Sequence, residues 1–410
     1  MDLGIIHREN FGSSCAYDYK SNVDFIARGA FGVIYRATIT DRGNFKGEQI
    51  VAVKTVHLDK DAEIWTCSTK WEKCLTRLKM LLAIGHENLV AYHKITITKN
   101  LGRSSVELMM DYYPDGDLAD HLKKYYDNKE LSKWSVAVSF ATDIAHGLHF
   151  LHSHNVIHGD LKPANVLVKA GSAFGISYSQ HRLLIGDLDD LVQMKRSVTC
   201  TDDITHLRGT IRFMSPEMLR KFSQTSLPAE NPGRKTDMWS LGCIMLELAG
   251  CIIGTERKWL RKNKFQKLEA GDKLTDPAFA KLIIDGYVPF VPNCEEISGP
   301  FATCIERCLC ISSEKRIPAD ELLQKLLEES PSYVGPTETV FKKQMRENLK
   351  IPVKGGQKTR DYRHPISSVV PQQILASYEL PHSSVSVTKT DECGSSYDAR
   401  ICCGTTLEMG

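Results

Sequence analysis

His158-Gly159-Asp160-Leu161-Lys162-Pro163-Ala164-Asn165 is the stretch of this 410-residue sequence that decides the fold. An amphipathic run over residues 136–154 precedes it and the apolar residues Val166-Leu167-Val168 follow it, so the pattern predicts a loop between a helix and a strand. The loop combines an acid, a lysine and an amide. Asp160 suits the role of proton acceptor, Lys162 that of a phosphate partner, and Asn165 that of a metal ligand. These are the requirements of phosphoryl transfer.

Two segments nearer the N-terminus have the composition of a nucleotide site. The first is Ile26-Ala27-Arg28-Gly29-Ala30-Phe31-Gly32-Val33-Ile34, between two predicted strands. Its glycines let backbone N–H groups approach phosphate oxygens, although a glycine pair alone is more typical of a simple turn. The second is Val51-Ala52-Val53-Lys54, where a lysine on a buried strand needs an anionic partner such as a nucleotide phosphate. Together the two segments favour a nucleotide site.

Three further motifs follow the central stretch along the chain. They are Gly186-Asp187-Leu188-Asp189, Gly209-Thr210-Ile211-Arg212-Phe213-Met214-Ser215-Pro216-Glu217, and Asp237-Met238-Trp239-Ser240-Leu241-Gly242, with Arg316 after them. In this order, the whole set resembles the motifs of eukaryotic protein kinases of the Ser/Thr-specific type. The resemblance implies an α+β fold with two lobes: a small antiparallel β lobe with one main helix, and a larger, mainly helical lobe.

The resemblance and the hydrophobic pattern together divide the chain. We expect an N-terminal tail over residues 1–22, a kinase domain over 23–328 and a disordered C-terminal tail over 329–410, where Ser, Thr, Pro, Gly and Lys are frequent. Within the domain, the expected parts are a small lobe (23–110), a hinge (111–116) and a large lobe (117–328). The predicted long helices cover 65–84, 118–126, 132–154, 236–249, 277–284, 300–310 and 319–328.

The family resemblance also implies a role for each matching residue. Asp160 would be the catalytic base, Lys54 and Lys162 would contact phosphates, and Asn165 and Asp187 would bind Mg²⁺. ATP would lie under the segment from Ile26 to Ile34 and against the hinge. The hinge residues are Met110 beside the adenine, the backbone of Asp111 and Tyr113, and Asp117 at the ribose. Supporting roles fall to Glu72, Thr210, Glu217, Asp237 and Arg316.

Five positions depart from the family pattern: Ala27, Arg77, Gly159, Leu188 and Asp189. The small-lobe helix should supply a Glu to hold Lys54. Counting back from residues 84–90 places Arg77 there, whereas counting forward from Lys54 reaches Glu72, and the two positions lie on different faces of a helix. These departures leave open an alternative function, a pseudokinase that acts as a nucleotide-binding scaffold or allosteric partner. A small-molecule kinase is disfavoured by the segments at 209–217 and 237–242.

Gly159 stands where the family has an arginine that receives an activation-segment phosphate. Activity is therefore expected not to depend on phosphorylation of Ser197, Thr199, Thr201 or Thr205.

Composition limits the partners. A net charge of +2 gives no reason to expect nucleic acid, and the longest apolar run, residues 242–254, is too short for a membrane span. Thirteen cysteines without paired spacing favour reduced thiols and a cytoplasmic protein, with the nucleus as a second compartment. We expect protein substrates, and regulatory protein partners at the C-terminal tail.

Overall fold

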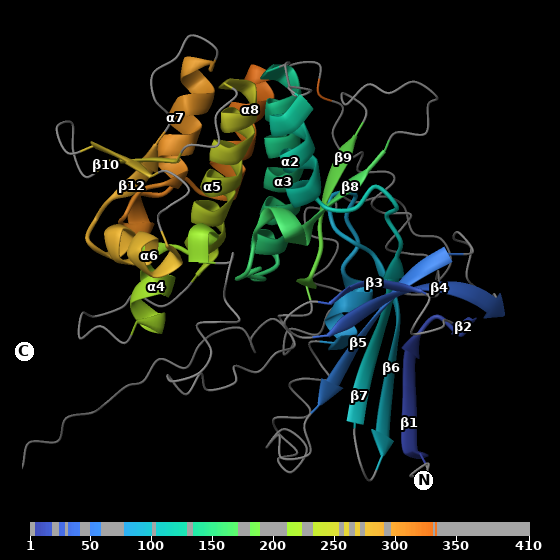
Figure 1. The fold of residues 1–410 in the computed structure, drawn as a ribbon. Helices are drawn as coiled ribbons and strands as arrows, with labels where there is room; N and C mark the ends of the chain where they lie inside the picture. Colours follow the sequence, from blue (N-terminus) through green and yellow to red (C-terminus); the bar gives the residue numbers. More distant parts are fainter. Residues whose placement is uncertain are drawn as a thin grey trace, which may run out of the picture. The chain divides into compact units, whose positions relative to one another are not determined.

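The computed structural model describes residues 5–18, 24–28, 32–41, 50–58, 78–100, 104–128, 134–170, 181–188, 211–223, 233–253, 258–261, 267–270, 275–290, 297–330 and 333. Figure 1 shows a sheet-based lobe built from the first part of the chain and a helical lobe built from the later part. The predicted two-lobed α+β fold is confirmed. The expected disordered tail falls almost entirely outside these residues.

The described residues of the small lobe include one antiparallel sheet of seven strands. Its order is β1-β6-β7-β5-β4-β2, and β3 pairs with β4. The strands are β1 (Ile5–Gly12), β2 (Ala16–Asp18), β3 (Phe25–Arg28), β4 (Val33–Asp41), β5 (Ile50–Leu58), β6 (Tyr92–Asn100) and β7 (Ser104–Asp111). Alternation along β5 divides its side chains between two apolar clusters: Ala52 joins the main core, and Val51 and Val53 join a second cluster. Covering on both faces makes β5 the rigid centre of the sheet.

The expected N-terminal tail is wrong for residues 5–18, because this segment supplies both β1 and β2. β1 pairs with β6 and β2 pairs with β4. Cys15, which is fully buried, donates from its Sγ to the Sδ of Met109 at 3.7 Å, and the Tyr17 hydroxyl donates to Glu107 at 3.0 Å. Backbone pairing and a few anchors hold such edge strands, so they need no hydrophobic pattern that a sequence would reveal.

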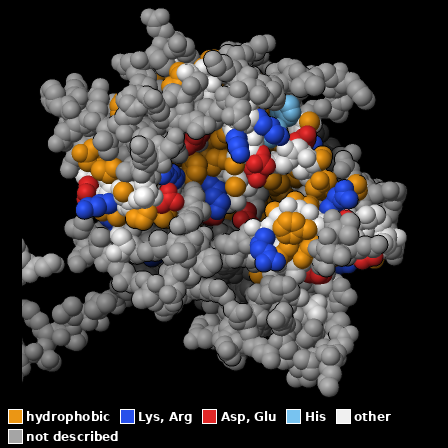
Figure 2. Space-filling view, in the orientation of Figure 1, with side chains coloured by type: hydrophobic (Ala, Val, Ile, Leu, Met, Phe, Trp, Pro, Cys, Tyr) orange, Lys and Arg blue, Asp and Glu red, His pale blue; other side chains and the backbone are white. Residues whose placement is uncertain are grey.

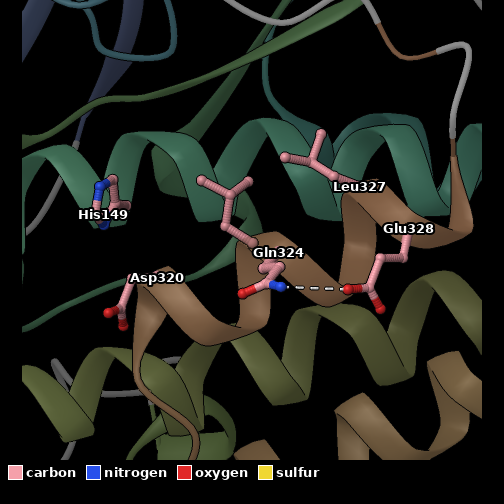
Figure 3. A pocket seen from close by; sticks show the side chains of 6 residues that line it. His149, Asp320, Gln324, Leu327 and Glu328 are labelled. Carbon is pink, nitrogen blue, oxygen red and sulfur yellow. Dashed lines mark hydrogen bonds between the residues drawn. The ribbon is translucent and has the colours of Figure 1, made fainter.

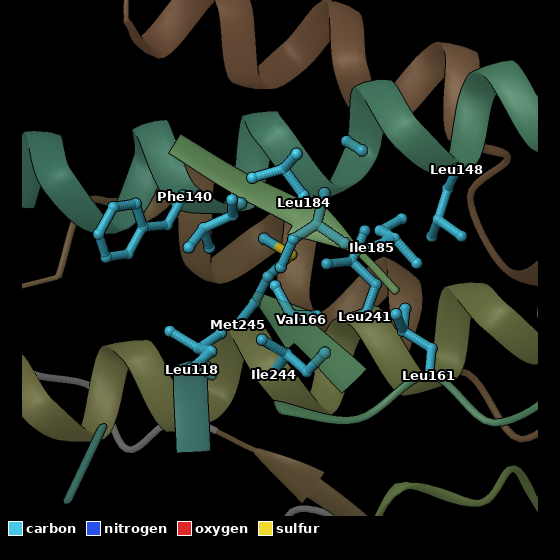
Figure 4. Close-up of a cluster of buried hydrophobic side chains, with 14 of the residues drawn as sticks. Leu118, Phe140, Leu148, Leu161, Val166, Leu184, Ile185, Leu241, Ile244 and Met245 are labelled. Atoms are coloured by element: carbon cyan, nitrogen blue, oxygen red, sulfur yellow. The ribbon is translucent and has the colours of Figure 1, made fainter. Parts of the chain in front are cut away.

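The large lobe is built around two long, buried helices. Its helices are α2 (Leu118–Asn128), α3 (Trp134–Ser153), α4 (Pro216–Phe222), α5 (Arg234–Ile253), α6 (Asp276–Ile284), α7 (Gly299–Cys308) and α8 (Ala319–Glu329). Figure 4 shows Phe140 and Leu148 of α3 with Ile244 and Met245 of α5 in one apolar core. The predicted helices of this lobe are confirmed; of the predicted helix at 65–84, residues 78–83 are described and are helical.

Short strands complete the large lobe. β8 (Val166–Lys169) and β9 (Arg182–Ile185) form an antiparallel pair. β10 (Lys258–Arg261), β11 (Lys267–Ala270) and β12 (Val288–Phe290) form a three-stranded sheet, which the sequence analysis did not anticipate. Strands of three or four residues are too short for a detectable alternation.

Described residues just beyond 328, the predicted end of the kinase domain, still contact the large lobe. Glu329 completes α8, and the N–H of Tyr333 donates to the Ser330 carbonyl at 2.9 Å. The Tyr333 hydroxyl donates to Asp143 of α3 at 2.5 Å. A single tyrosine held by a buried carboxylate leaves no periodic pattern, so the sequence did not predict this contact.

One described helix, α5, is long and apolar enough to cross a membrane. Of its most apolar window, 78% is buried inside the lobe, as in a core helix of a folded domain. On the described surface in Figure 2, acidic and basic side chains are interspersed, as a net charge near zero leads one to expect.

Gly12 provides a test of the β1 strand. Its φ is +88°, and an added Cβ would lie 2.3 Å from the His93 carbonyl oxygen. Gly12→Ala should therefore lower the free energy of unfolding by roughly 2–4 kcal/mol, from backbone strain and steric overlap together. Urea denaturation measures the change.

The matched control is Gly286→Ala. Gly286 has a φ of +92°, and no described atom lies within 4 Å of its added Cβ. It should lose only the strain contribution, roughly 1–2 kcal/mol. Equal losses in the two variants would show that residues 5–18 do not pack against β6 as described.

Candidate active site

The carboxylate of Asp237, in the first turn of α5, holds the backbone of the loop at residues 158–165. Its Oδ2 accepts the N–H of His158 at 2.9 Å and its Oδ1 accepts the N–H of Gly159 at 2.8 Å. The Nε2 of His152, on α3, lies 2.8 Å from Oδ2. Burial raises the pKa of Asp237, but the hydrogen bond and charge of His152 and the loop N–H groups outweigh it, so the net pKa is lowered. An ionised Asp237 therefore fixes the loop backbone.

Asp160, Lys162 and Asn165 lie together at the top of the loop. The Nζ of Lys162 donates to Asp160 Oδ2 at 2.6 Å. The Nδ2 of Asn165 donates to the Asp160 carbonyl at 2.8 Å and to Oδ2 at 3.3 Å. Asp160 Oδ1 is buried and has no hydrogen-bond partner among the described residues. A buried carboxylate oxygen without a donor is costly unless a ligand supplies one, so Oδ1 is the atom poised to accept a proton.

Asp187 directly follows Gly186, and hydrogen bonds of the Gly186 backbone connect this segment to the loop at residues 158–165. The N–H of Gly186 donates to the Asn165 carbonyl at 2.8 Å, and the Gly186 carbonyl lies 2.9 Å from the Nε2 of His158. Asp187 itself has a φ of +56°, an uncommon conformation for a residue with a side chain and one often found at functional sites. The Nζ of Lys54 forms an ion pair with Asp187 Oδ1. The lysine of β5 and the acid after β9 therefore meet.

Leu188 behaves as an apolar plug. It is 1% exposed, and its N–H donates to the Tyr92 hydroxyl at 3.2 Å. Replacing the family's phenylalanine by leucine thus keeps a buried side chain after Asp187. Asp189, the larger departure at this motif, lies outside the described residues.

These residues fit a magnesium nucleotide. Mg²⁺ is usually held by one or two carboxylates with waters and phosphate oxygens rather than by a full protein cage. Asp187 supplies a carboxylate, and both described hydrogen bonds of the Asn165 side chain use Nδ2, which leaves its amide oxygen to face a cation. Among the described residues, no group of three or more His, Cys, Asp or Glu could hold a metal by itself. The donor set therefore suits a metal that arrives with phosphates.

The end of the glycine-rich segment forms the start of β4, which pairs with the strand that carries Lys54. Ile26, Ala27 and Arg28 belong to β3, while Val33 and Ile34 begin β4, where Ile34 pairs with Lys54. An added Cβ on Gly32 would lie 2.5 Å from the Thr55 carbonyl oxygen, so that position requires glycine. Ala27, the first departure, is exposed. The tip of the segment, Gly29-Ala30-Phe31, lies outside the described residues.

The hinge side chains bond to one another and to the elements on either side of the hinge. Asp111 lies 2.6 Å from the Nε2 of His93 and accepts from the Tyr113 hydroxyl at 3.4 Å. The Oδ1 of Asp117 accepts the N–H of Asp120 at 3.0 Å and caps α2. Burial raises the pKa of Asp117. The predicted contacts of Asp111 and Tyr113 with adenine and of Asp117 with ribose stay predictions. Met110 is 7% exposed at the end of β7.

Glu217 and Arg316 form the predicted buried pair. The guanidinium donates to the two carboxylate oxygens at 2.6 and 2.7 Å, and the exposed fractions are 1% for Arg316 and 2% for Glu217. The same guanidinium donates to the Cys310 carbonyl at 2.7 Å and lies 5.2 Å from the Trp239 ring centre. Burial by itself would raise the pKa of Glu217. The hydrogen bonds and the charge of Arg316 outweigh this effect, so the net shift of the pKa is downward. The pair ties α4 to the segment before α8.

Sequence reasoning missed the residues that join the two lobes around β9. The Asn88 carbonyl accepts the N–H of Ile185 at 2.8 Å, the N–H of Val90 donates to the Ile185 carbonyl at 2.9 Å, and the Asn88 side chain donates to the Leu183 carbonyl at 3.0 Å. These contacts bring the approach to Asp187 against the small lobe. Only the polar break in the apolar run at 84–90 hinted at them. Glu72, Arg77 and Thr210 lie outside the described residues.

A groove on α8 is separate from these residues. It has a volume of about 500 Å³, is open to solvent, and is lined by His149, Asp320, Leu323, Gln324, Leu327 and Glu328. Figure 3 shows His149 on α3 facing the acidic and apolar side chains of α8. None of these residues belongs to the site described above, so the groove carries no catalytic assignment.

Comparison with known proteins identifies the family. Residues 21–327 match the protein kinase domain family. The chain belongs to the protein kinase family. It is 25% identical over 320 residues to the MAP kinase kinase kinase SSK2 of Saccharomyces cerevisiae, covering 73% of this chain and 18% of that protein. It is 26% identical over 301 residues to human mitogen-activated protein kinase kinase kinase 1, covering 73% of this chain and 17% of that protein.

A third relative is mouse mitogen-activated protein kinase kinase kinase 3, which is 27% identical over 223 residues, 54% of this chain and 31% of that protein. The kinase chain spans less than a third of the length of each of these three relatives. The likeness therefore concerns the catalytic domain.

The buried pair yields a stability prediction. Arg316→Met should lower the free energy of unfolding by roughly 3–5 kcal/mol, because it leaves the Glu217 carboxylate buried without its partner. Chemical denaturation gives the value. The control is Arg307→Met, because Arg307 and its partner Glu321 have side chains that are 36% and 42% exposed. Removing an exposed pair should cost less than about 1 kcal/mol. A small loss for Arg316→Met would contradict the buried-pair assignment.

Proposed function

We propose that this protein kinase transfers the terminal phosphoryl group of ATP to Ser or Thr hydroxyls of protein substrates. The observation that carries the proposal is Asp160, whose buried Oδ1 has no hydrogen-bond partner among the described residues while its Oδ2 accepts from Lys162 and Asn165. A substrate hydroxyl can supply the missing donor. Asp160 then orients that hydroxyl and takes its proton as the phosphoryl group arrives.

The other charged residues have complementary roles. Lys162, 2.6 Å from Asp160, is placed to neutralise charge on the transferred phosphoryl group. Lys54 would bind nucleotide phosphates, and Asn165 and Asp187 would hold Mg²⁺, which supplies charge neutralisation at the phosphates when bound. The Lys54–Asp187 pair keeps both side chains in the site before a nucleotide enters.

The substrate class follows from the loop and the relatives. Lys162 resembles the lysine of Ser/Thr-specific family members. The relatives are named as MAP kinase kinase kinases, that is, kinases that act on other kinases, and we extend that class to this chain: its protein substrate is itself a protein kinase. We also propose that the protein works in the cytoplasm, or in both cytoplasm and nucleus, and binds regulatory partners through its C-terminal residues.

A second function, a nucleotide-binding pseudokinase, is favoured by one observation. Lys54 pairs with Asp187, so each of these charges has an opposite charge within the chain itself. In a scaffold protein this closed pair would persist, and the chain would act through binding partners alone. The two functions differ in whether Asp160 matters.

Replacing Asp160 distinguishes the active kinase from the pseudokinase. Asp160→Asn keeps the side-chain shape but cannot accept a proton as a carboxylate does, so phosphorylation of an acceptor protein should fall by roughly 10²- to 10⁴-fold. Radiolabelled ATP and both a generic acceptor and a purified kinase substrate measure it. Asp120→Asn, on the exposed face of α2, should leave the rate unchanged. Equal incorporation by wild type and Asp160→Asn would reject the enzyme, and a Mg²⁺-dependent nucleotide thermal shift would then test the pseudokinase.

Gly159 predicts how the enzyme is controlled. Glycine has no side chain, so this position carries no cation to hold an activation-segment phosphate. Replacing Ser197, Thr199, Thr201 and Thr205, which lie outside the described residues, by Ala together should leave the specific activity within about twofold of wild type. The same acceptor assay measures it, with circular dichroism confirming the fold. Loss of activity in the folded variant would show that the switch is present.

A further inference from the structure

Tyr333 lies beyond residue 327, where the match to the protein kinase domain ends, yet its half-buried side chain makes several contacts with the large lobe. Its hydroxyl donates to Asp143 Oδ1 at 2.5 Å. Its ring stacks on His146, with ring centres 5.7 Å apart and planes inclined by 16°, and the Arg182 guanidinium lies 4.9 Å from the ring centre. Three contacts to α3 and β9 therefore fix one side chain from the C-terminal extension.

Asp143 connects the Tyr333 hydroxyl to strand β9. It is fully buried on α3. Besides the Tyr333 hydroxyl, its Oδ1 accepts from Arg182 Nη1 at 3.2 Å, and its Oδ2 accepts the N–H of Leu183 at 2.9 Å. Burial raises the pKa of Asp143; Tyr333, the Leu183 N–H, Arg182 and Asn88 each lower it by less, so the net shift is upward. A buried carboxylate needs all of its donors, because losing one exposes the full desolvation penalty of the charge.

Two of these three donors come from β9, the strand that leads to Asp187. Arg182 and Leu183 are its first residues, and Asp187 follows two residues after its end. On its other side, the Leu183 carbonyl accepts from Asn88 at 3.0 Å. The start of β9 is thus held between Asn88 of the small-lobe side and Asp143 of α3. Whatever fixes the Asp143 carboxylate also fixes the backbone that presents Asp187.

We propose that Tyr333 is a positioning residue for Asp187: it holds the Asp143 carboxylate against the start of β9, and so supports the metal-binding site from outside residues 21–327. The chain beyond α8 would then control the site through one hydroxyl. This inference rests on the proposed function only in assigning Mg²⁺ to Asp187.

A purely structural anchor is the rival explanation. An anchor would lower the stability of the whole lobe when removed but would not act on β9 in particular. The two explanations differ in where the loosened amides lie, and in whether Mg²⁺ binding is affected.

The test is Tyr333→Phe, which removes only the hydroxyl and keeps the ring on His146. Amide hydrogen exchange of the protein without nucleotide should be roughly tenfold faster at Leu183 and Ile185, as expected for the loss of a hydrogen bond to a charged group. The Mg²⁺ concentration for half-maximal ADP thermal shift should rise severalfold. The matched control is Tyr125→Phe, whose hydroxyl lies 3.4 Å from His121 of its own helix, α2. It should change neither quantity.

A double-mutant cycle tests whether Tyr333 acts on β9 through Asp143. In an Asp143→Asn background, Tyr333→Phe should add less than about a twofold change in β9 exchange, because the charge through which the hydroxyl acts is gone. Unchanged exchange at Leu183 and Ile185 in Tyr333→Phe, or an equal effect of Tyr333→Phe in both backgrounds, would overturn the proposal. The exchange measurement needs no nucleotide, so it decides the positioning role even where the wild type fails to bind ADP and the proposed function falls.

Discussion

The site depends on one buried carboxylate, that of Asp237. A loop that places an acid, a lysine and an amide in one spot has no regular backbone pairing of its own, so something rigid must hold its N–H groups. Asp237 does this from the first turn of α5, bonding two successive loop N–H groups while His152 of α3 bonds the same carboxylate. The two most buried helices of the lobe thus converge on the loop. Their packing is what keeps Asp160 in place.

A second constraint operates between the lobes. Lys54 comes from the sheet and Asp187 from the end of β9, and they meet only if β9 is held against the small lobe. Asn88 and Val90 achieve this with backbone hydrogen bonds to Ile185, and the Tyr92 hydroxyl holds Leu188 just beyond. Backbone bonds of this kind depend little on side-chain identity. They allow the motif residues to tolerate changes such as Leu188 while the spacing between charges is preserved.

The sequence predicted what local pattern and motif spacing can express. The long helices α3 and α5 follow from their apolar runs, and Asp237, Glu217 and Arg316 were found because their motifs place them at fixed positions in the family. Asn88 and Tyr92 were not found, because a backbone carbonyl and a phenol gain their roles only when β9 arrives beside them. Residues 5–18 were misjudged for a related reason. Edge strands expose half their side chains and are held by pairing with β6 and β4, so composition makes them resemble a tail.

Residues 5–18 and Tyr333 both lie in segments that the sequence assigned to tails. The first contacts the lobe that carries Lys54, and the second contacts the residue that holds the strand before Asp187. Near the N-terminus, Lys79 of the small-lobe helix lies 4.7 Å from the Phe11 ring centre, and the Tyr17 hydroxyl bonds Glu107 on β7, so residues 5–18 brace the lobe that carries Lys54. Near the C-terminus, Tyr333 bonds the carboxylate that fixes β9. Lys54 and Asp187 form the ion pair that spans the site, and each is therefore supported by chain outside residues 21–327. In the proposed mechanism the family fold carries the charged residues, and residues 5–18 together with Tyr333 add contacts that hold the elements bearing them.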